Sequence, residues 1–381
     1  MHVNREPWTV DRRTVLRGGL AAMAAGVGTA VLGPGGALLG TGAGAAPKVP
    51  TTKPSKLVVR SWGPPWSSTI GDIPGKAFTA KTGIPVEFDL TDFTVMDTKV
   101  RLAVRSGHRP PVDVMYTIGR SCYAASAQKV LVPLDPGIVT NLAHISPAGK
   151  PQGSASDYVL VYTYTTPLIY RTDKLKLTNG MSWQVMWDAA YKGRLFVPAN
   201  FDPLLFPVAK MLKRNPASGN LAPVWAKFKT LRPNIQVVGD DTPFINNMKT
   251  GEVWLGSALV GDALALQQTT KVPVDWIVPK EGAVLTGDGM YVPKNLPSDV
   301  TYWAQVFVNE VIDARLQTQW TGKVETVPTN LGATPAAFMK GNPAFPFTAA
   351  EIEKYAIPEP LAAAAKNGDG WQANYTAAIQ K

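Results

Sequence analysis

The sequence predicts an α/β protein with two lobes that are joined by crossing strands. From residue 56 onward, short apolar runs typical of buried strands alternate with segments of helical spacing. This alternation indicates right-handed βαβ units and mainly parallel sheets flanked by helices. Between residues 251 and 292, an apolar run is followed by a helical segment and then by a long strand-like segment that ends at a lone acid. We expect the chain to pass there from one lobe to the other, beside a binding cleft.

The length and composition are those of a globular protein with two domains. The chain has 381 residues, of which 45% are hydrophobic and 17% are charged. Its net charge of +10 is spread along the chain without a run of Lys or Arg, so no nucleic acid partner is predicted. Cys122 is the single cysteine, and the three histidines lack metal-ligand spacing. We therefore expect no disulfide, no metal and no cofactor.

The N-terminal residues have the features of an export signal. Arg12 and Arg13 precede a weakly apolar Gly/Ala-rich stretch, residues 18–46, whose small residues near the end are typical of a signal-peptidase site. A single-pass membrane anchor is the alternative, but the many glycines make a poor spanning helix. We expect a twin-arginine (Tat) signal peptide in residues 1–46, a linker in residues 47–55, and a soluble protein exported to a Gram-negative periplasm.

Strands and helices alternate regularly in the part of the chain that follows the linker. Strands are predicted at residues 56–61, 84–90 and 112–118. Helices are predicted at residues 74–81, 100–104 and 122–129. Gly83 suits the left-handed position that ends a helix. Because ligands of such sheets bind beyond the carboxyl ends of strands, we expect the loops at residues 62–66 and 117–121 to face a ligand.

The second lobe is entered along a strand and left along another. Residues 159–170 are apolar and rich in Thr and Tyr, which favours a first crossing between lobes. The elements predicted next are a short helix at residues 182–191, a strand at 195–197, and helices at 201–213 and 222–231. Residues 253–260 then form a buried strand, and Asp262 is predicted to cap a helix at residues 263–268. Residues 272–278 alternate as a strand does, but their flanking prolines indicate an edge position.

The returning strand is predicted to end in a loop that holds one acid. Asp288 lies between Gly287 and Gly289, and we expect its carboxylate to face the cleft; a simple turn residue is the alternative. Beyond it, Ser298 is predicted to cap a helix with one apolar face. A Pro/Gly-rich loop at residues 321–347 and helices at residues 348–356 and 369–380 complete the chain.

Six segments carry a resemblance to a known family. They are KLVVRSWG (56–63), TGIPVEFD (82–89), SWQVMWDAAYKGRLFVP (182–198), GEVWLG (251–256), VPVDWIVPKEGAV (272–284) and GWQANY (370–375). In this order they resemble the periplasmic substrate-binding proteins of ABC importers, in the spermidine/putrescine-binding branch. The resemblance implies the two-lobed type II fold, with lobe 1 at residues 56–163 and 286–328 and lobe 2 at 164–285 and 329–381. It also implies a monomer that delivers a small solute to a membrane permease and its ATPase.

The resemblance further implies a set of residues that contact the solute. They are Trp62 as an aromatic wall, Asn200 where the family usually has an acid, Asp241 as a polar contact, Asp288 as the partner of a ligand amine, and Gln372 as a late polar contact. These residue types suit a cation, because a desolvated ammonium needs carboxylates within hydrogen-bond reach and an aromatic face. The alternatives are structural: a core aromatic for Trp62 and a helix cap for Asp240 or Asp241.

Other positions depart from the pattern of the polyamine binders. Leu259, Thr286 and Val327 stand where aromatic residues are usual, and Gly63-Pro64-Pro65 replaces an acid. Arg120 stands in place of a tyrosine. It could repel a polyamine, form an ion pair at the start of its helix, or bind the acidic group of a zwitterionic or anionic solute such as an amino acid, a phosphonate or a carboxylate. The residues therefore leave two classes of solute open.

An enzyme is an alternative function, because three short motifs occur in the order found in serine penicillin-recognising hydrolases. They are Ser126–Lys129 (SxxK), Ser218–Asn220 (SxN) and Lys249–Gly251 (KTG). Their context argues against this remote alternative, since Ser126 comes late in its predicted helix and KTG occurs again at residues 81–83. Both KTG copies are expected to end a helix before a strand. We expect a binding protein without catalytic activity.

Overall fold

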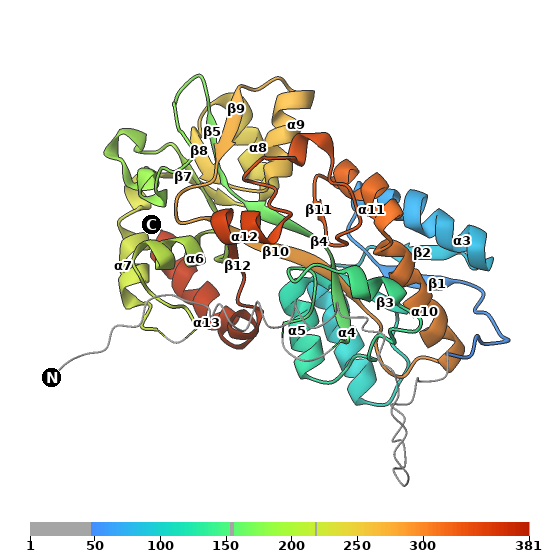
Figure 1. Ribbon diagram of the computed structural model, residues 1–381. Helices are drawn as coiled ribbons and strands as arrows, with labels where there is room; N and C mark the ends of the chain where they lie inside the picture. The colour runs from blue at the N-terminus through green and yellow to red at the C-terminus, as the bar shows by residue number, and fades with distance from the viewer. Residues whose placement is uncertain (1–46, 153–155, 218, 381) are drawn as a thin grey trace, which may run out of the picture. The chain divides into compact units, whose positions relative to one another are not determined.

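Two mixed β-sheets, each flanked by helices, form the two lobes of the protein (Figure 1). The computed structural model describes residues 47–152, 156–217 and 219–380. The predicted twin-arginine signal, residues 1–46, and its alternative as a membrane anchor lie outside the described residues. Of the helices within the described ranges, none is both long enough and apolar enough to cross a membrane.

The first sheet has the strand order β11-β4-β10-β3-β1-β2, and β12 pairs with β10. Its strands are β1 (Leu57–Arg60), β2 (Val86–Asp89), β3 (Val114–Ile118), β4 (Tyr158–Thr166), β10 (Ala283–Tyr291), β11 (Val327–Pro328) and β12 (Ala356–Pro358). The helices of this lobe are α2 (Trp66–Ile70), η1 (Gly71–Gly75), α3 (Lys76–Thr82), α4 (Phe93–Arg105), α5 (Gly119–Ala127), η2 (Thr140–His144), α10 (Ser298–Val311), α11 (Ala314–Trp320) and η6 (Thr321–Val324). Its core includes Phe78 of α3, which packs edge-on against Phe307 of α10 with ring centroids 5.6 Å apart.

The second sheet has the strand order β7-β6-β8-β5-β9. Its strands are β5 (Leu168–Arg171), β6 (Leu195–Pro198), β7 (Ile235–Gly239), β8 (Leu255–Ser257) and β9 (Val274–Ile277). The remaining helices are η3 (Trp183–Trp187), η4 (Ala189–Tyr191), α6 (Asp202–Met211), α7 (Ala222–Lys229), η5 (Arg232–Asn234), α8 (Asp241–Thr250), α9 (Val260–Thr269), η7 (Ala337–Met339), α12 (Ala349–Tyr355) and α13 (Leu361–Ile379). As predicted from its prolines, β9 is an edge strand.

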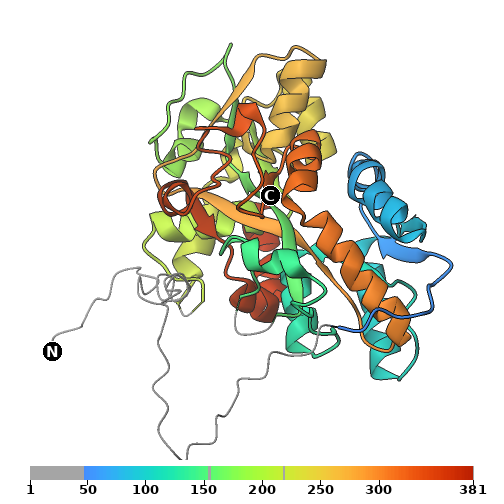
Figure 2. The same ribbon diagram turned by 45° about the vertical axis from the view of Figure 1, so that its right-hand side comes forward.

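Two strand pairs carry the chain between the lobes, as the sequence predicted. Only Pro167 separates β4 of the first sheet from β5 of the second, and β9 of the second sheet leads into β10 of the first. β4 and β10 are hydrogen-bonded to each other in antiparallel register and lie side by side between the lobes (Figure 2). α13 adds a further link, because it packs against α5 of the first lobe and α7 of the second.

The sheets are mixed rather than mainly parallel. β1 runs parallel to β2 and β3, and β6 runs parallel to β7 and β8, as βαβ units require. The crossing strands break this pattern, since β10 runs antiparallel to β3 and β4, and β5 runs antiparallel to β8 and β9. The parallel strands lie on one side of each sheet, and the crossing strands on the other.

The predicted Gly-Asp-Gly loop was wrong, both as a cleft loop and as a turn. Asp288 lies inside β10, paired with Ile118 of β3 and Tyr162 of β4. Its neighbouring glycines are required by close packing. A Cβ atom on Gly287 would lie 2.2 Å from the carbonyl oxygen of Tyr162, and one on Gly289 would lie 2.9 Å from the sulfur of Cys122. The glycines therefore let the crossing strand pass close to its neighbours.

Several helix ends also differ from the predictions. Leu259 is the N-cap residue of α9, and Asp262 lies in the first turn of that helix instead. Pro297 is the N-cap residue of α10, and Ser298 is its first helical residue. α13 begins at Leu361, eight residues before the predicted start at 369, because Gly368 and Gly370 are accommodated within a helix that tertiary packing holds. Both KTG segments end a helix before a strand, as predicted, with Gly83 and Gly251 in the left-handed conformation.

Candidate ligand-binding site

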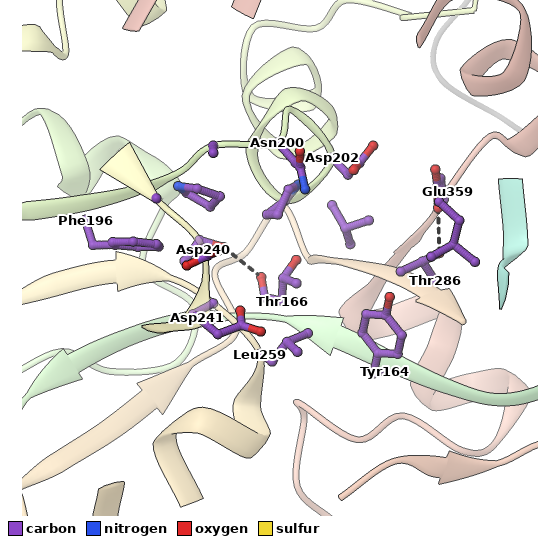
Figure 3. A pocket seen from close by; sticks show the side chains of 18 of the residues that line it. Tyr164, Thr166, Phe196, Asn200, Asp202, Asp240, Asp241, Leu259, Thr286 and Glu359 are labelled. Carbon is purple, nitrogen blue, oxygen red and sulfur yellow. Dashed lines mark hydrogen bonds between the residues drawn. The ribbon is translucent and has the colours of Figure 1, made fainter. Parts of the chain in front are cut away.

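A cavity of about 260 Å³ lies between the two sheets (Figure 3). It opens at the carboxyl ends of β3, β6, β7 and β8, where ligands of open α/β sheets bind, and the crossing strands β4 and β10 form part of its wall. The predicted loop at residues 117–121 contributes Ile118 and Arg120 to the lining, whereas the loop at residues 62–66 does not reach it. Ile118, Leu259 and Val284 give the middle of the cavity an apolar wall.

The acidic end of the cavity is lined by Asp240 and Asp241, and two further carboxylates, Asp262 and Glu325, lie near them. Asp240 follows β7 at the N-cap position of α8 but makes no capping hydrogen bond, and Asp241 is the first residue of that helix. Both side chains line the cavity (Figure 3), where a helix N-terminus favours negative charge. Asp262 and Glu325 do not line the cavity but lie close by, since the charges of Asp241 and Glu325 both act on Asp262.

The pKa values at the acidic end show that its charges lack a counter-charge. Burial and the charge of Asp240 raise the pKa of Asp241. Burial, followed by the charges of Asp241 and Glu325, raises the pKa of Asp262 to about 8. Burial also raises the pKa of Glu325. A cation placed here would stabilise the ionised carboxylates and lower these pKa values.

The arginine end of the cavity is formed by Arg120, Asp202 and Glu359. Arg120 at the start of α5 forms an ion pair with Asp202 at the start of α6, and its Nη1 atom lies 3.7 Å from Oε1 of Glu359. The guanidinium also lies over the ring of Phe201, 5.3 Å from its centroid. Because α5 belongs to the first lobe and α6 to the second, this ion pair bridges the lobes across the cavity.

Glu359 is the most buried charged residue of the cavity wall. It is 6% exposed, and its Oε2 atom accepts a hydrogen bond of 2.5 Å from the hydroxyl of Thr286. Burial and the charge of Asp202 raise the pKa of Glu359. The charge of Arg120 and the hydrogen bond from Thr286 lower it, and the resulting pKa is about 7. Its Oε1 atom accepts no hydrogen bond from any described residue.

Asp288 lies beyond the cavity wall, in a buried polar cluster of the first lobe. Along β10 it follows Val284 and Thr286 on the same face, because side chains alternate along a strand. The hydroxyl of Tyr162 donates a hydrogen bond of 2.6 Å to Asp288 Oδ2 and accepts one of 2.7 Å from Tyr116. Burial raises the pKa of Asp288 to about 6, although the Tyr162 hydrogen bond and the charge of Arg60 lower it.

Trp62 and Gln372 also lie outside the cavity wall. The guanidinium of Arg60 lies 4.1 Å from the ring centroid of Trp62, so this aromatic face already holds a cation. The Gln372 amide donates to the carbonyl of Ala199 at 2.9 Å and accepts from the backbone of Phe201 at 3.2 Å. Gln372 thereby fixes the loop that carries Asn200 into the cavity.

The cavity thus brings together three of the six predicted site residues. Arg120, Asn200 and Asp241 line it. Contact of Trp62, Asp288 and Gln372 with a solute stays a prediction. Among the positions that depart from the polyamine binders, Leu259 and Thr286 line the cavity, while Val327 is buried in β11 outside it.

Sequence reasoning missed the two acids of the arginine end, Asp202 and Glu359. Asp202 follows the predicted strand at residues 195–197 closely enough for the strand-end rule to have found it. Glu359 comes directly after β12, which pairs with β10, whereas this part of the chain carried no predicted strand. Only the pairing of β12 places Glu359 beside Arg120.

The residues of the hydrolase motifs are not brought together. The Ser126 hydroxyl lies late in α5 and donates a hydrogen bond of 2.7 Å to Asp157, whereas Lys249 ends α8 in the other lobe. Ser218 lies outside the described residues. The described part of these motifs therefore lacks the nucleophile–base contact that acyl transfer needs.

Two α/β lobes, crossing strands and a cavity between the lobes define the class of two-lobed, type II periplasmic binding proteins. The chain belongs to the family of bacterial extracellular solute-binding proteins, whose model matches residues 75–347. This match covers most of the described chain, including the whole second sheet; it leaves out β1 and β12 of the first sheet and Glu359 of the cavity lining.

Two relatives in sequence are named for polyamines. The spermidine/putrescine-binding periplasmic protein of Escherichia coli (strain K12) is 26% identical over 228 residues, which cover 57% of this chain and 63% of that protein. The match therefore spans only about three fifths of the length of that relative. The putrescine-binding periplasmic protein SpuD of Pseudomonas aeruginosa (strain UCBPP-PA14) is 26% identical over 298 residues, covering 71% of this chain and 78% of that protein.

A solved structure agrees with the fold. The substrate-binding protein PotD of the spermidine/putrescine ABC transporter from Streptococcus pneumoniae strain Canada MDR_19A superposes with a TM-score of 0.69. The two chains are 20% identical, and the superposition covers 86% of this chain and 100% of that one. At 20% sequence identity, this structural similarity supports a shared fold and nothing further.

Proposed function

We propose that the protein is the extracytoplasmic solute receptor of an ABC importer and that its solute is a small amine. The acidic end of the cavity carries this proposal. Burial and neighbouring carboxylates raise the pKa values of Asp241 and Asp262, and among the described residues no basic side chain contributes to the pKa of Asp241, Asp262 or Glu325. An ammonium group placed there would supply the missing charge and hydrogen-bond donors. The names of the polyamine-binding relatives support the same class of solute.

The solute would bind with its ammonium at Asp240 and Asp241 and its carbon chain along the apolar wall. Leu259 and Val284 belong to that wall, which suits methylene groups. Asp241 belongs to the second lobe, while Ile118 of the first lobe faces the same cavity. A solute that contacts both lobes stabilises the closed arrangement, because those contacts exist only when the lobes are together.

The alternative of a zwitterionic or anionic solute requires a free guanidinium at Arg120. In the structure Arg120 is already paired with Asp202 and lies near Glu359. An acidic solute would have to displace a carboxylate that the fold holds in place, and it would add negative charge to a cavity whose lining carries an excess of carboxylates. The geometry therefore favours the amine.

The remaining parts of the proposal concern location and partners. The family relationship supports a place outside the cytoplasmic membrane, and we propose that residues 1–46 direct export by the twin-arginine route. The loaded receptor, a monomer, would deliver its solute to a membrane permease and its ATPase. Its role is binding without catalysis of its own.

A thermal-shift screen with four-carbon compounds tests the proposal. Putrescine, n-butylamine, butyrate and 1,4-butanediol share a carbon skeleton and differ in charge. Because a ligand of the folded state raises the melting temperature, the amines should raise it and butyrate and butanediol should leave it unchanged. Stabilisation by butyrate alone would contradict the proposal, and conversion of any compound during incubation would point to an enzyme instead.

A further inference from the structure

The arginine end of the cavity contains its own cation. Asp202 is bound by Arg120, and the same guanidinium lies 3.7 Å from Glu359, a residue that is only 6% exposed. Oε1 of Glu359 points to this arginine and accepts no hydrogen bond from the described residues. A single guanidinium of the protein itself thus lies against both carboxylates that could receive an ammonium group.

The buried cluster around Asp288 also contains a cation of the protein itself, Arg60. Arg60 is 2% exposed and is held by hydrogen bonds to the carbonyl oxygens of Thr91 and Tyr116. Its charge acts on Asp288, and its guanidinium covers the face of Trp62. The aromatic face that would suit a second ammonium is therefore covered by Arg60, and the charge of the same arginine already acts on the carboxylate.

The acidic end is different, because it has carboxylates and no arginine. Asp240 and Asp241 lie at the opposite end of the cavity from Glu359 (Figure 3). In the described part of the chain, no basic side chain contributes to the pKa of Asp241 or of Asp262 behind it. The acidic end of the cavity thus lacks a cation among the described residues, whereas the arginine end already contains the guanidinium of Arg120.

We infer that Arg120 takes the place of a second ammonium group, so that the receptor selects amines with one cationic group over diamines. The inference rests on the proposed function and narrows its solute class. The second ammonium of a diamine would lie beside the guanidinium of Arg120, whose like charge would repel it while it loses its hydration. A monoamine of the same length places only methylene or methyl groups there.

The test compares n-butylamine with putrescine, which has the same four carbons and one more ammonium. Calorimetric titration of the wild-type protein should show that putrescine binds no more than about threefold more tightly than n-butylamine. Arg120→Met keeps the length and apolar stem of the side chain but removes the charge. In this variant Asp202 and Glu359 are free to pair with a second ammonium, and the preference for putrescine should rise about tenfold or more.

Two controls accompany the variant. A far-UV circular dichroism spectrum and a cooperative thermal unfolding transition like those of wild type show that the Arg120→Met variant is folded. Adding Asp202→Asn and Glu359→Gln to Arg120→Met removes the freed carboxylates, and the preference for putrescine should return to the wild-type value.

The outcomes separate this inference from the proposed function. A wild-type preference for putrescine of tenfold or more, or an unchanged preference in Arg120→Met, would overturn the role of Arg120 while leaving the amine receptor intact. Failure of the wild-type protein to bind either amine would overturn both.

Discussion

Asp241 and Asp288 are both acids that the sequence marked as solute contacts, yet they lie in opposite surroundings. Asp288 is 5% exposed, accepts a hydrogen bond from Tyr162, and has its pKa lowered by the charge of Arg60. Asp241 lines the cavity beside Asp240, and no basic side chain of the described residues contributes to its pKa. A carboxylate is available to a ligand only where the fold leaves its charge without a partner. By this criterion we propose that Asp241 contacts the solute and that Asp288 contributes to the stability of the fold instead.

The largest expected effect concerns the pH dependence of stability at Asp288. Burial raises its pKa from 3.8 to about 6. Below about pH 4 the carboxyl is protonated in both the folded and the unfolded chain, whereas above about pH 6 the folded chain bears a buried charge. A pKa difference of about two therefore costs about 3 kcal/mol of folding free energy as the pH rises through this window.

Because asparagine cannot ionise, the Asp288→Asn variant should not lose folding free energy in this way. Between about pH 4 and pH 7, the unfolding free energy of the variant should gain about 3 kcal/mol relative to wild type, measured by urea denaturation. Its affinity for an amine should change less than about threefold. A large loss of amine affinity, with the pH dependence of the unfolding free energy unchanged, would place Asp288 in the binding site. Asp288 and Asp241 would then not differ in role.

The second effect concerns affinity at Asp241. Asp241→Asn removes one charge from the acidic end and should weaken binding of n-butylamine by about 2 kcal/mol, roughly thirtyfold, in calorimetric titration. Asp275→Asn is the matched control, since Asp275 is an exposed carboxylate on β9 of the same lobe, away from the cavity lining. Equal losses in the two variants would show that only the net charge of the lobe matters.

The third and smallest effect is the pH dependence of amine binding. The pKa of Asp262, raised to about 8, leaves this carboxyl largely protonated at neutral pH. An ammonium favours the ionised form, so binding should release a proton, and affinity should rise about tenfold between pH 6 and pH 8. Asp262→Asn should flatten this rise. A wild-type affinity that is flat over this range would contradict the assignment of the acidic end.

The sequence was sufficient to predict most of the fold because its signals are local. The crossing at residues 159–170 is a long apolar run, and the edge position of β9 follows from its flanking prolines. The short strands β11 and β12 could not be predicted, since they consist of two and three residues held only by pairing with β4 and β10. Their placement depends on tertiary contacts with those two strands.

The site likewise contains residues that a local sequence pattern could predict and residues that only tertiary contacts bring together. Asp241 could be found because it follows a strand and opens a helix, which is a local pattern. The Gly-Asp-Gly segment was misjudged because glycines that permit close strand packing look like turn glycines in a sequence. The partners of Arg120 are 82 and 239 residues away in the chain, so its ion pairs could not be predicted from spacing.

A crystal structure of the protein with n-butylamine tests the central claim most directly. We predict that the ammonium nitrogen lies within hydrogen-bond distance of the carboxylates of Asp240 or Asp241, with Arg120 still paired to Asp202. An ammonium found beside Glu359 or Asp288, with the acidic end of the cavity empty, would contradict it.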